Sequence, residues 1–160
     1  MSRIKCAAVS AAACAAIIAA SASAAAAKTS ALHFFSKQVY SRISDANGHP
    51  AVPPLTVGDR LSFANNDYAG NHKHHAKQAT ASDHVVCAVT STITSSALCD
   101  GTIAIGGSMI FGDDFVLNFI SDAATTVKIT GGTGVYRHAR GTIVVKPVGD
   151  NNDLTIKVSS

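Results

Sequence analysis

The sequence predicts an all-β domain of about eight short strands, arranged as an antiparallel barrel or as a β-sandwich. The chain of 160 residues is rich in Thr, Val, Ser and Gly and contains no Glu, a composition that favours strands over helices. Short segments alternate polar and apolar residues, and clusters of Gly, Asn and Asp separate them, as turns do. The hydrophobic content of 47% excludes a disordered chain, and the length suits one domain.

Each expected strand is a short alternating or β-branched segment that ends at turn residues. The expected strands are Leu32–Tyr40, Arg60–Phe63, His84–Thr92, Ala97–Ile105, Ser108–Phe111, Phe115–Ile120, Thr125–Thr130, Val135–Val145 and Leu154–Val158. The segment Asn65–Ala81 has no apolar run and is expected to be a polar loop. Gly112-Asp113-Asp114 is expected to be the tight turn between two of the strands.

The clearest pair is the hairpin of His84–Thr92 and Ala97–Ile105. A turn centred near Ile93 places Cys87 opposite Cys99, Val89 opposite Ala97 and Ser91 opposite Ser95. Directly opposed residues of antiparallel strands lie close enough at Cβ for a disulfide bond, so a Cys87–Cys99 bridge is expected. The alternative is two free thiols.

The first 27 residues have the order of a secretory signal peptide. Arg3 and Lys5 give a positive start, an alanine-rich apolar run follows, and small residues lead to a cleavage site near Ala27. A retained membrane anchor is disfavoured because the run is short for a spanning helix, and lipoprotein cleavage at Cys14 is a further alternative. Residues 28–160 would form the mature domain, exported to an extracellular, oxidising compartment that suits a disulfide.

Charge limits the possible partners. The whole sequence has 13 Lys and Arg against 10 acidic residues, but Arg3 and Lys5 leave with the signal peptide, so little net charge remains. Because no long basic run is left, nucleic-acid binding has no support, and no stable membrane anchor is expected.

Two segments resemble one barrel family. Ile129–Gly141 (ITGGTGVYRHARG) is similar to the glycine-rich signature of plant dirigent proteins and to the matching stretch of allene oxide cyclases. Val57–Tyr68 (VGDRLSFANNDY) is similar to a segment near the front of the cyclase barrel. The resemblance extends from about Leu32 to Val158, and it implies an eight-stranded antiparallel β-barrel that assembles as a homo-oligomer.

The resemblance also implies a function. Allene oxide cyclases favour one ring closure of an unsaturated epoxide, and dirigent proteins steer the coupling or cyclisation of phenolic compounds, neither with a cofactor. We therefore expect a secreted barrel that binds an apolar or phenolic small molecule and directs its cyclisation or stereoselective coupling, as an isomerase-like or dirigent-type protein. Catalysis of this kind depends mainly on positioning in a preorganised cavity.

The candidate site residues lie at the end of one expected strand and in the glycine-rich segment. At the strand end, Asp67 is the expected proton acceptor and Tyr68 the expected donor, with Asn65 in ligand binding. In the glycine-rich segment, Arg140 is a catalytic candidate, and Tyr136 and Arg137 are ligand-binding candidates. Because residues three apart on a strand face opposite sides, at most one of the two arginines points inward if the strand is regular.

Two other functions stay open. The histidines of the polar loop and of the strand after it (His72, His74, His75 and His84) are weak candidates for a metal site, with a solvated or pH-responsive loop as the alternative. A non-catalytic barrel, acting as a ligand carrier or as an envelope interaction module, is the other rival. A cavity filled by its own Val, Ile and Phe side chains would favour that rival.

Overall fold

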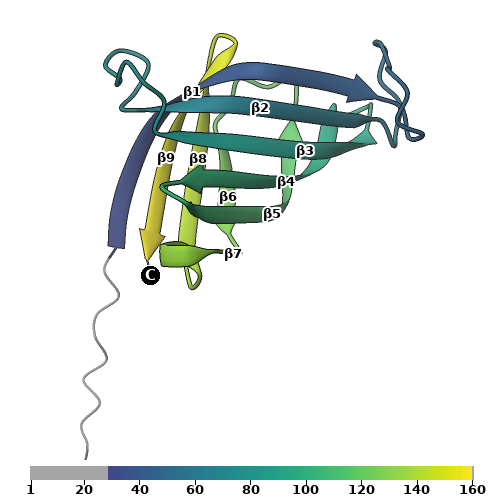
Figure 1. Cartoon of the computed structure of the whole chain (residues 1–160). Helices are drawn as coiled ribbons and strands as arrows, with labels where there is room; N and C mark the ends of the chain where they lie inside the picture. Colours follow the sequence, from purple (N-terminus) through teal and green to yellow (C-terminus); the bar gives the residue numbers. More distant parts are fainter. Residues whose placement is uncertain (1–28, 160) are drawn as a thin grey trace, which may run out of the picture.

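The computed structural model describes residues 29–159, and the expected signal peptide lies outside them. One antiparallel sheet contains every strand of this range, and it curls into a nearly closed barrel (Figure 1). The order across the sheet is β6-β8-β9-β1-β2-β3-β4-β5-β7. The barrel expectation is therefore confirmed, and the β-sandwich alternative is wrong because there is no second sheet within the described residues.

The elements follow one another along the chain without an α-helix in the described range. They are β1 (Thr29–Ser44), β2 (Arg60–Ala69), β3 (Ala81–Ser91), β4 (Ser96–Ile105), β5 (Ser108–Asn118), β6 (Thr125–Ile129), β7 (Gly131–Gly132), the short 3-10 helix η1 (Gly134–Tyr136), β8 (Arg140–Val148) and β9 (Asn151–Ser159). Between residues 29 and 159, no helix has the length and hydropathy needed to cross a bilayer.

β2 continues to Ala69, so the first five residues of the expected polar loop Asn65–Ala81 belong to a strand. Two further expected elements differ from the structure. β5 passes through the expected turn as one strand, because Asp114 adopts a positive φ of 55° and forms a bulge opposite β4. The Asp114 amide donates to the Asp100 carboxylate at 3.0 Å, which fixes the bulge. In the second case, Val135 lies in η1 and β8 begins only at Arg140, so the expected strand Val135–Val145 starts five residues too early.

The β3–β4 hairpin has the expected register. Cys87 pairs with Cys99 and forms the disulfide, and Val89 pairs with Ala97. The third expected pair is wrong by one residue, since Ser91 pairs with Ser96. The cause is a bulge in β3, where Thr90 is the extra residue between Val89 and Ser91.

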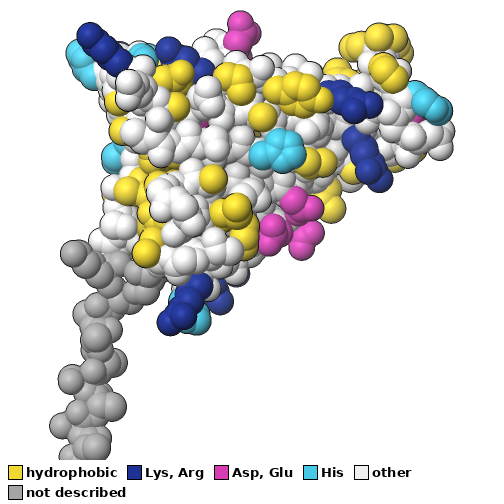
Figure 2. Space-filling model, viewed as in Figure 1, with side chains coloured by type: hydrophobic (Ala, Val, Ile, Leu, Met, Phe, Trp, Pro, Cys, Tyr) yellow, Lys and Arg dark blue, Asp and Glu magenta, His cyan; other side chains and the backbone are white. Residues whose placement is uncertain are grey.

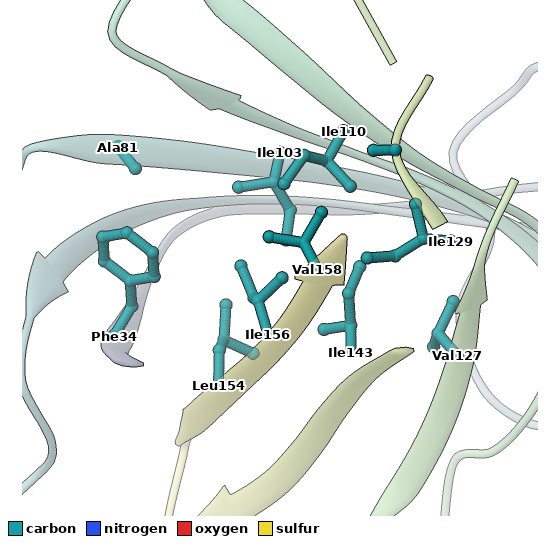
Figure 3. Packing of buried hydrophobic residues seen from close by; sticks show 11 residues of the cluster. Phe34, Ala81, Ile103, Ile110, Val127, Ile129, Ile143, Leu154, Ile156 and Val158 are labelled. Atoms are coloured by element: carbon teal, nitrogen blue, oxygen red, sulfur yellow. The ribbon is translucent and has the colours of Figure 1, made fainter. Parts of the chain in front are cut away.

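The interior contains two apolar clusters. The larger one fills one end of the barrel and includes Ile110, Ile129, Ile143 and Ile156, whose side chains converge from different strands (Figure 3). The second cluster surrounds the disulfide where β2, β3 and β4 extend away from that end, with Leu61, Val89 and Ala97. The alternating burial of β3 shows why this sheet has an interior, since every second residue from Ala81 to Val89 faces inward.

The barrel is not closed by a continuous ladder. β6 forms one edge of the sheet, and β7 forms the other. On the side of β5 away from β4, only the two residues of β7 pair with it in the described chain. A backbone hydrogen bond joins the end of β6 to β5. The Thr130 amide donates to the Phe111 carbonyl oxygen at 3.0 Å. Along the rest of this seam Gly112 packs against Val127, where a larger residue has no room.

Candidate functional site

A cavity of about 210 Å³ lies inside the barrel between the two apolar clusters. Most of its wall is apolar and comes from strands far apart in the sequence. The apolar lining residues include Phe63, Val85, Ile103, Phe115, Leu117, Val127, Ile143, Val145 and Leu154. The polar lining residues are Gln38, Asn65, Asp83, Thr102, Thr125 and Asn152, of which only Asp83 is ionisable.

Strand register brings four inward-facing polar side chains together at the wall formed by β1, β2 and β3. Asn65 is directly opposite Asp83 across β2 and β3, and Ser36 is directly opposite Asp67 across β1 and β2. The Asn65 amide donates to Asp83 Oδ1 at 2.6 Å, and the Ser36 hydroxyl donates to Asp83 Oδ2 at 2.7 Å. Because both oxygens of Asp83 accept hydrogen bonds, the site is built to hold this group as an anion.

Asp67 is in a different environment from Asp83. It is completely buried, and neither of its carboxyl oxygens has a hydrogen-bond partner. The pKa of Asp67 is raised to about 8, chiefly by burial and then by the charge of Asp83. Near neutral pH, Asp67 is therefore the neutral acid of the pair and Asp83 the charged base, since two adjacent buried carboxyls do not both ionise readily.

This arrangement can hold and move one proton beside an apolar molecule. Each carboxylate oxygen of Asp83 has a second lone pair, so it can still accept a hydrogen bond from a ligand hydroxyl. At a buried carboxylate such as Asp83, this bond is stronger than it is in water. By contrast, the outer face shown in Figure 2 is largely uncharged, and its charged side chains lie mostly toward the margins of the view.

Tyr68 lies on the outer side of the wall that holds Asn65 and Asp67. It is paired with Phe35, and both rings contact His75, with ring centroids 5.7 Å and 4.9 Å from the imidazole. The Lys37 ammonium lies 4.9 Å from the Tyr68 ring centre on this same side. Alternation along β2 explains the result, because Asn65 and Asp67 share one face and Tyr68 has the other.

The three candidates of the glycine-rich segment do not line the cavity. The Arg140 guanidinium donates to the carbonyl oxygens of Thr130 and Ala139, at 3.2 and 2.7 Å, so it supports a turn. Arg137 is exposed at the end of η1. Tyr136 is half-buried and packs against the larger apolar cluster. In place of the regular strand expected through these residues, the chain forms η1 and a turn before β8 begins at Arg140.

The histidines of the loop between β2 and β3 are dispersed. His72 contacts the Asp153 carboxylate of β9 at 2.5 Å, and His75 packs in the aromatic contact described above. His84 belongs to β3 and lies 3.1 Å from the Ser62 hydroxyl, while His74 is exposed. Within residues 29–159, no three His, Cys or Asp side chains come together as metal ligands do, so the described chain gives the metal hypothesis no geometric support.

Sequence reasoning missed Asp83 and Ser36 as members of the site. Asp83 is 7% exposed and lies on the same face of β3 as Cys87 and Val89. The alternation of β3 would therefore have placed it inside the barrel. The expected strand began three residues too late, at His84, and so left out Asp83. Ser36 is completely buried and lies two residues after Phe34, on the same inward face of β1.

The sequence matches no protein-family model, and no curated protein matches it. Several solved structures share its fold. Pyocyanin demethylase matches with a TM-score of 0.60 and 22% identical residues, over 81% of this chain and 99% of the other. A pterocarpan synthase dirigent protein matches with a TM-score of 0.62 and 19% identity, over 82% and 83% of the two chains.

A second pterocarpan synthase dirigent protein matches with a TM-score of 0.60 and 17% identity, over 82% of this chain and 94% of that one. At these identities the likeness concerns the fold. The chain therefore has a dirigent-like β-barrel, and the barrels similar to it include proteins named for acting on small molecules.

Proposed function

We propose that this protein binds an apolar or phenolic small molecule in the barrel cavity and directs its cyclisation or stereoselective coupling without a cofactor. The observation that carries the proposal is the Asp83 carboxylate, held by Asn65 and Ser36 inside a cavity whose wall is otherwise mostly apolar. The apolar wall favours a hydrophobic guest, and the carboxylate orients it through a hydroxyl group.

The chemistry that suits this site is an isomerisation that starts with the loss of a proton. Asp83 accepts the proton from a ligand hydroxyl, and the electron pair left on oxygen becomes available for closing a ring. The proton then returns from Asp83 to the ring-closed product, so no atom is gained or lost. Asp67, a neutral acid near pH 7, stabilises the charge on Asp83 while the guest is bound.

The test compares compounds that purify with wild-type protein, Asp83→Asn and Asp150→Asn. The last variant removes the same charge from an exposed turn and is the matched control. After denaturation and extraction, mass spectrometry is expected to find an apolar or phenolic compound on wild type and on the control, and at least ten-fold less on Asp83→Asn. Loss of a hydrogen bond to a charged group, of about 1.5–3 kcal/mol, gives a factor of this size.

The extracted compound is expected to be the ring-closed product, and its open-chain isomer, supplied to fresh wild-type protein, is expected to be converted to it, with equal mass and a different retention time. Binding without conversion would contradict the directing role and favour a ligand carrier, the second candidate function. That candidate is favoured by the same apolar lining, which retains a guest without requiring chemistry. Equal amounts of compound on all three proteins would contradict the role of Asp83.

We also propose that the protein is exported and acts outside the cell as residues 28–160. The proposal rests on the signal-peptide pattern of the first 27 residues and on the Cys87–Cys99 bond, which persists in oxidising compartments. The intact mass of protein from the culture medium is expected to match a chain that begins at Lys28, lighter by the two hydrogen atoms that a disulfide removes. Retention of the leader in the cytosolic fraction would contradict export.

A further inference from the structure

The cavity has negative charge without a positive partner. Asp83 is part of its wall, and Asp67 lies beside Asp83 in the next row of the ladder. No Lys, Arg or His belongs to the lining residues within the described chain. The ion pairs of residues 29–159, His49–Asp45 and His72–Asp153, are on the surface and involve neither carboxyl.

The cations nearest in sequence to the pair point to the opposite side of the wall. Lys37 follows Ser36 in β1, but its ammonium lies over the Phe35 and Tyr68 rings on the outer face. His84 follows Asp83 in β3, and its imidazole contacts the exposed Ser62 hydroxyl. Ser36, Gln38 and Asn65, which face inward beside the carboxyls, are neutral. The wall therefore presents a carboxylate that only neutral donors stabilise.

A buried charge with no counter-ion is costly, and a ligand of opposite charge offsets that cost. The rings of Phe63 and Phe115 also line the cavity, and aromatic faces attract cations but not anions. We infer that the natural guest is an aromatic compound that carries a cationic nitrogen, as an amine, a quaternary ammonium or a charged heteroaromatic ring. The inference rests on the proposed function, because it names the ligand class of that same cavity.

The test uses two probes of the same shape that differ in charge. N,N,N-trimethylanilinium is a cation, and tert-butylbenzene is its uncharged isostere. Ligand-observed NMR titration of wild-type protein is expected to give at least ten-fold tighter binding of the cation. In Asp83→Asn the ratio of the two dissociation constants is expected to fall to about one, whereas Asp150→Asn keeps the wild-type ratio.

A second measurement needs no variant and so does not depend on the folding of Asp83→Asn. Because Asp67 loses its proton near pH 8, the cation is expected to bind more tightly at pH 9 than at pH 6, while the affinity of the uncharged probe stays the same. Protons are released as the cation binds near pH 7, which calorimetry in buffers of different ionisation enthalpy detects.

The outcomes separate this inference from the proposal on which it rests. If both probes bind equally, or the uncharged one binds more tightly, the inference of a cationic guest is overturned and the small-molecule cavity stands. If neither probe binds at its solubility limit, the proposed cavity function fails and this inference fails with it. Equal pH dependence of both probes would also overturn the charge argument.

Discussion

Replacing Asp67 with asparagine is expected to remove most of the pH dependence of stability between about pH 4 and pH 8. In the folded protein, burial raises the pKa of Asp67 from the ordinary value of 3.8 to about 8. In the unfolded chain the group ionises at its ordinary value. Between these two pH values the native state therefore binds one more proton than the unfolded state, so the free energy of unfolding decreases as pH rises.

The expected loss in wild type over this pH range is several kcal/mol, and at most about 6 kcal/mol for a pKa displaced from 3.8 to about 8. The stabilisation is complete below pH 4, where both states hold the proton, and is lost once pH exceeds 8. Asp67→Asn cannot ionise, and its amide can donate to Asp83, so at pH 9 the variant is expected to be more stable than wild type by about 2–4 kcal/mol.

Urea denaturation at intervals from pH 4 to pH 9 measures this effect. Asp150→Asn removes a charge from an exposed turn and is expected to keep the wild-type slope, which separates burial from net charge. A wild-type protein whose stability rises steadily from pH 4 to pH 9 would show that Asp67 is ionised in the native state. The proton assignment within the site would then be wrong.

Gly141→Ala is expected to destabilise the protein by at least about 3 kcal/mol, or to prevent folding. Gly141 has a φ of 138°, a conformation that residues with a Cβ rarely adopt. A Cβ at this position would overlap the carbonyl oxygen of Lys157 on the neighbouring strand β9. Backbone cannot move aside as a flexible side chain can, so the β8–β9 ladder must distort.

Gly149→Ala is the matched control for the steric part of this prediction. Gly149 also has a positive φ, of 60°, but a Cβ there meets nothing within 4 Å. It is therefore expected to lose only about 1 kcal/mol, the cost of the conformation alone. The midpoint and slope of urea unfolding give both values. Equal losses in the two variants would show that contact with Lys157 is not the cause.

The alternation of inward and outward side chains along a strand was the reliable guide to site residues in the sequence. It places Asn65 and Asp67 on the inward face together with Leu61 and Phe63, and the same rule turns Tyr68 outward. Applied to β3 from Ala81, it would have found Asp83 as well. What it could not supply is the pairing of Ser36 with Asp67, which depends on a register between strands thirty residues apart.

The two cysteines made the β3–β4 register predictable, because a disulfide joins residues that lie directly opposite each other on paired strands. In the glycine-rich segment no such constraint exists. Gly134 has a φ of 55° and begins η1, so the chain still turns at Val135, where alternation suggested that a strand begins. The residues after it change direction, and Arg137 and Arg140 consequently do not line the barrel cavity.

The seam between β5 and β6 determines where the wall of the cavity can change shape. Elsewhere in the described wall, neighbouring strands are joined by rows of backbone hydrogen bonds, and spreading them would break several at once. Along Asp113–Asn118 the edge of β5 that faces β6 has no such ladder. This gap lies beside the cavity-lining residues Phe115, Leu117, Thr125 and Val127, so widening the cavity on this side would disturb side-chain packing before it broke backbone hydrogen bonds.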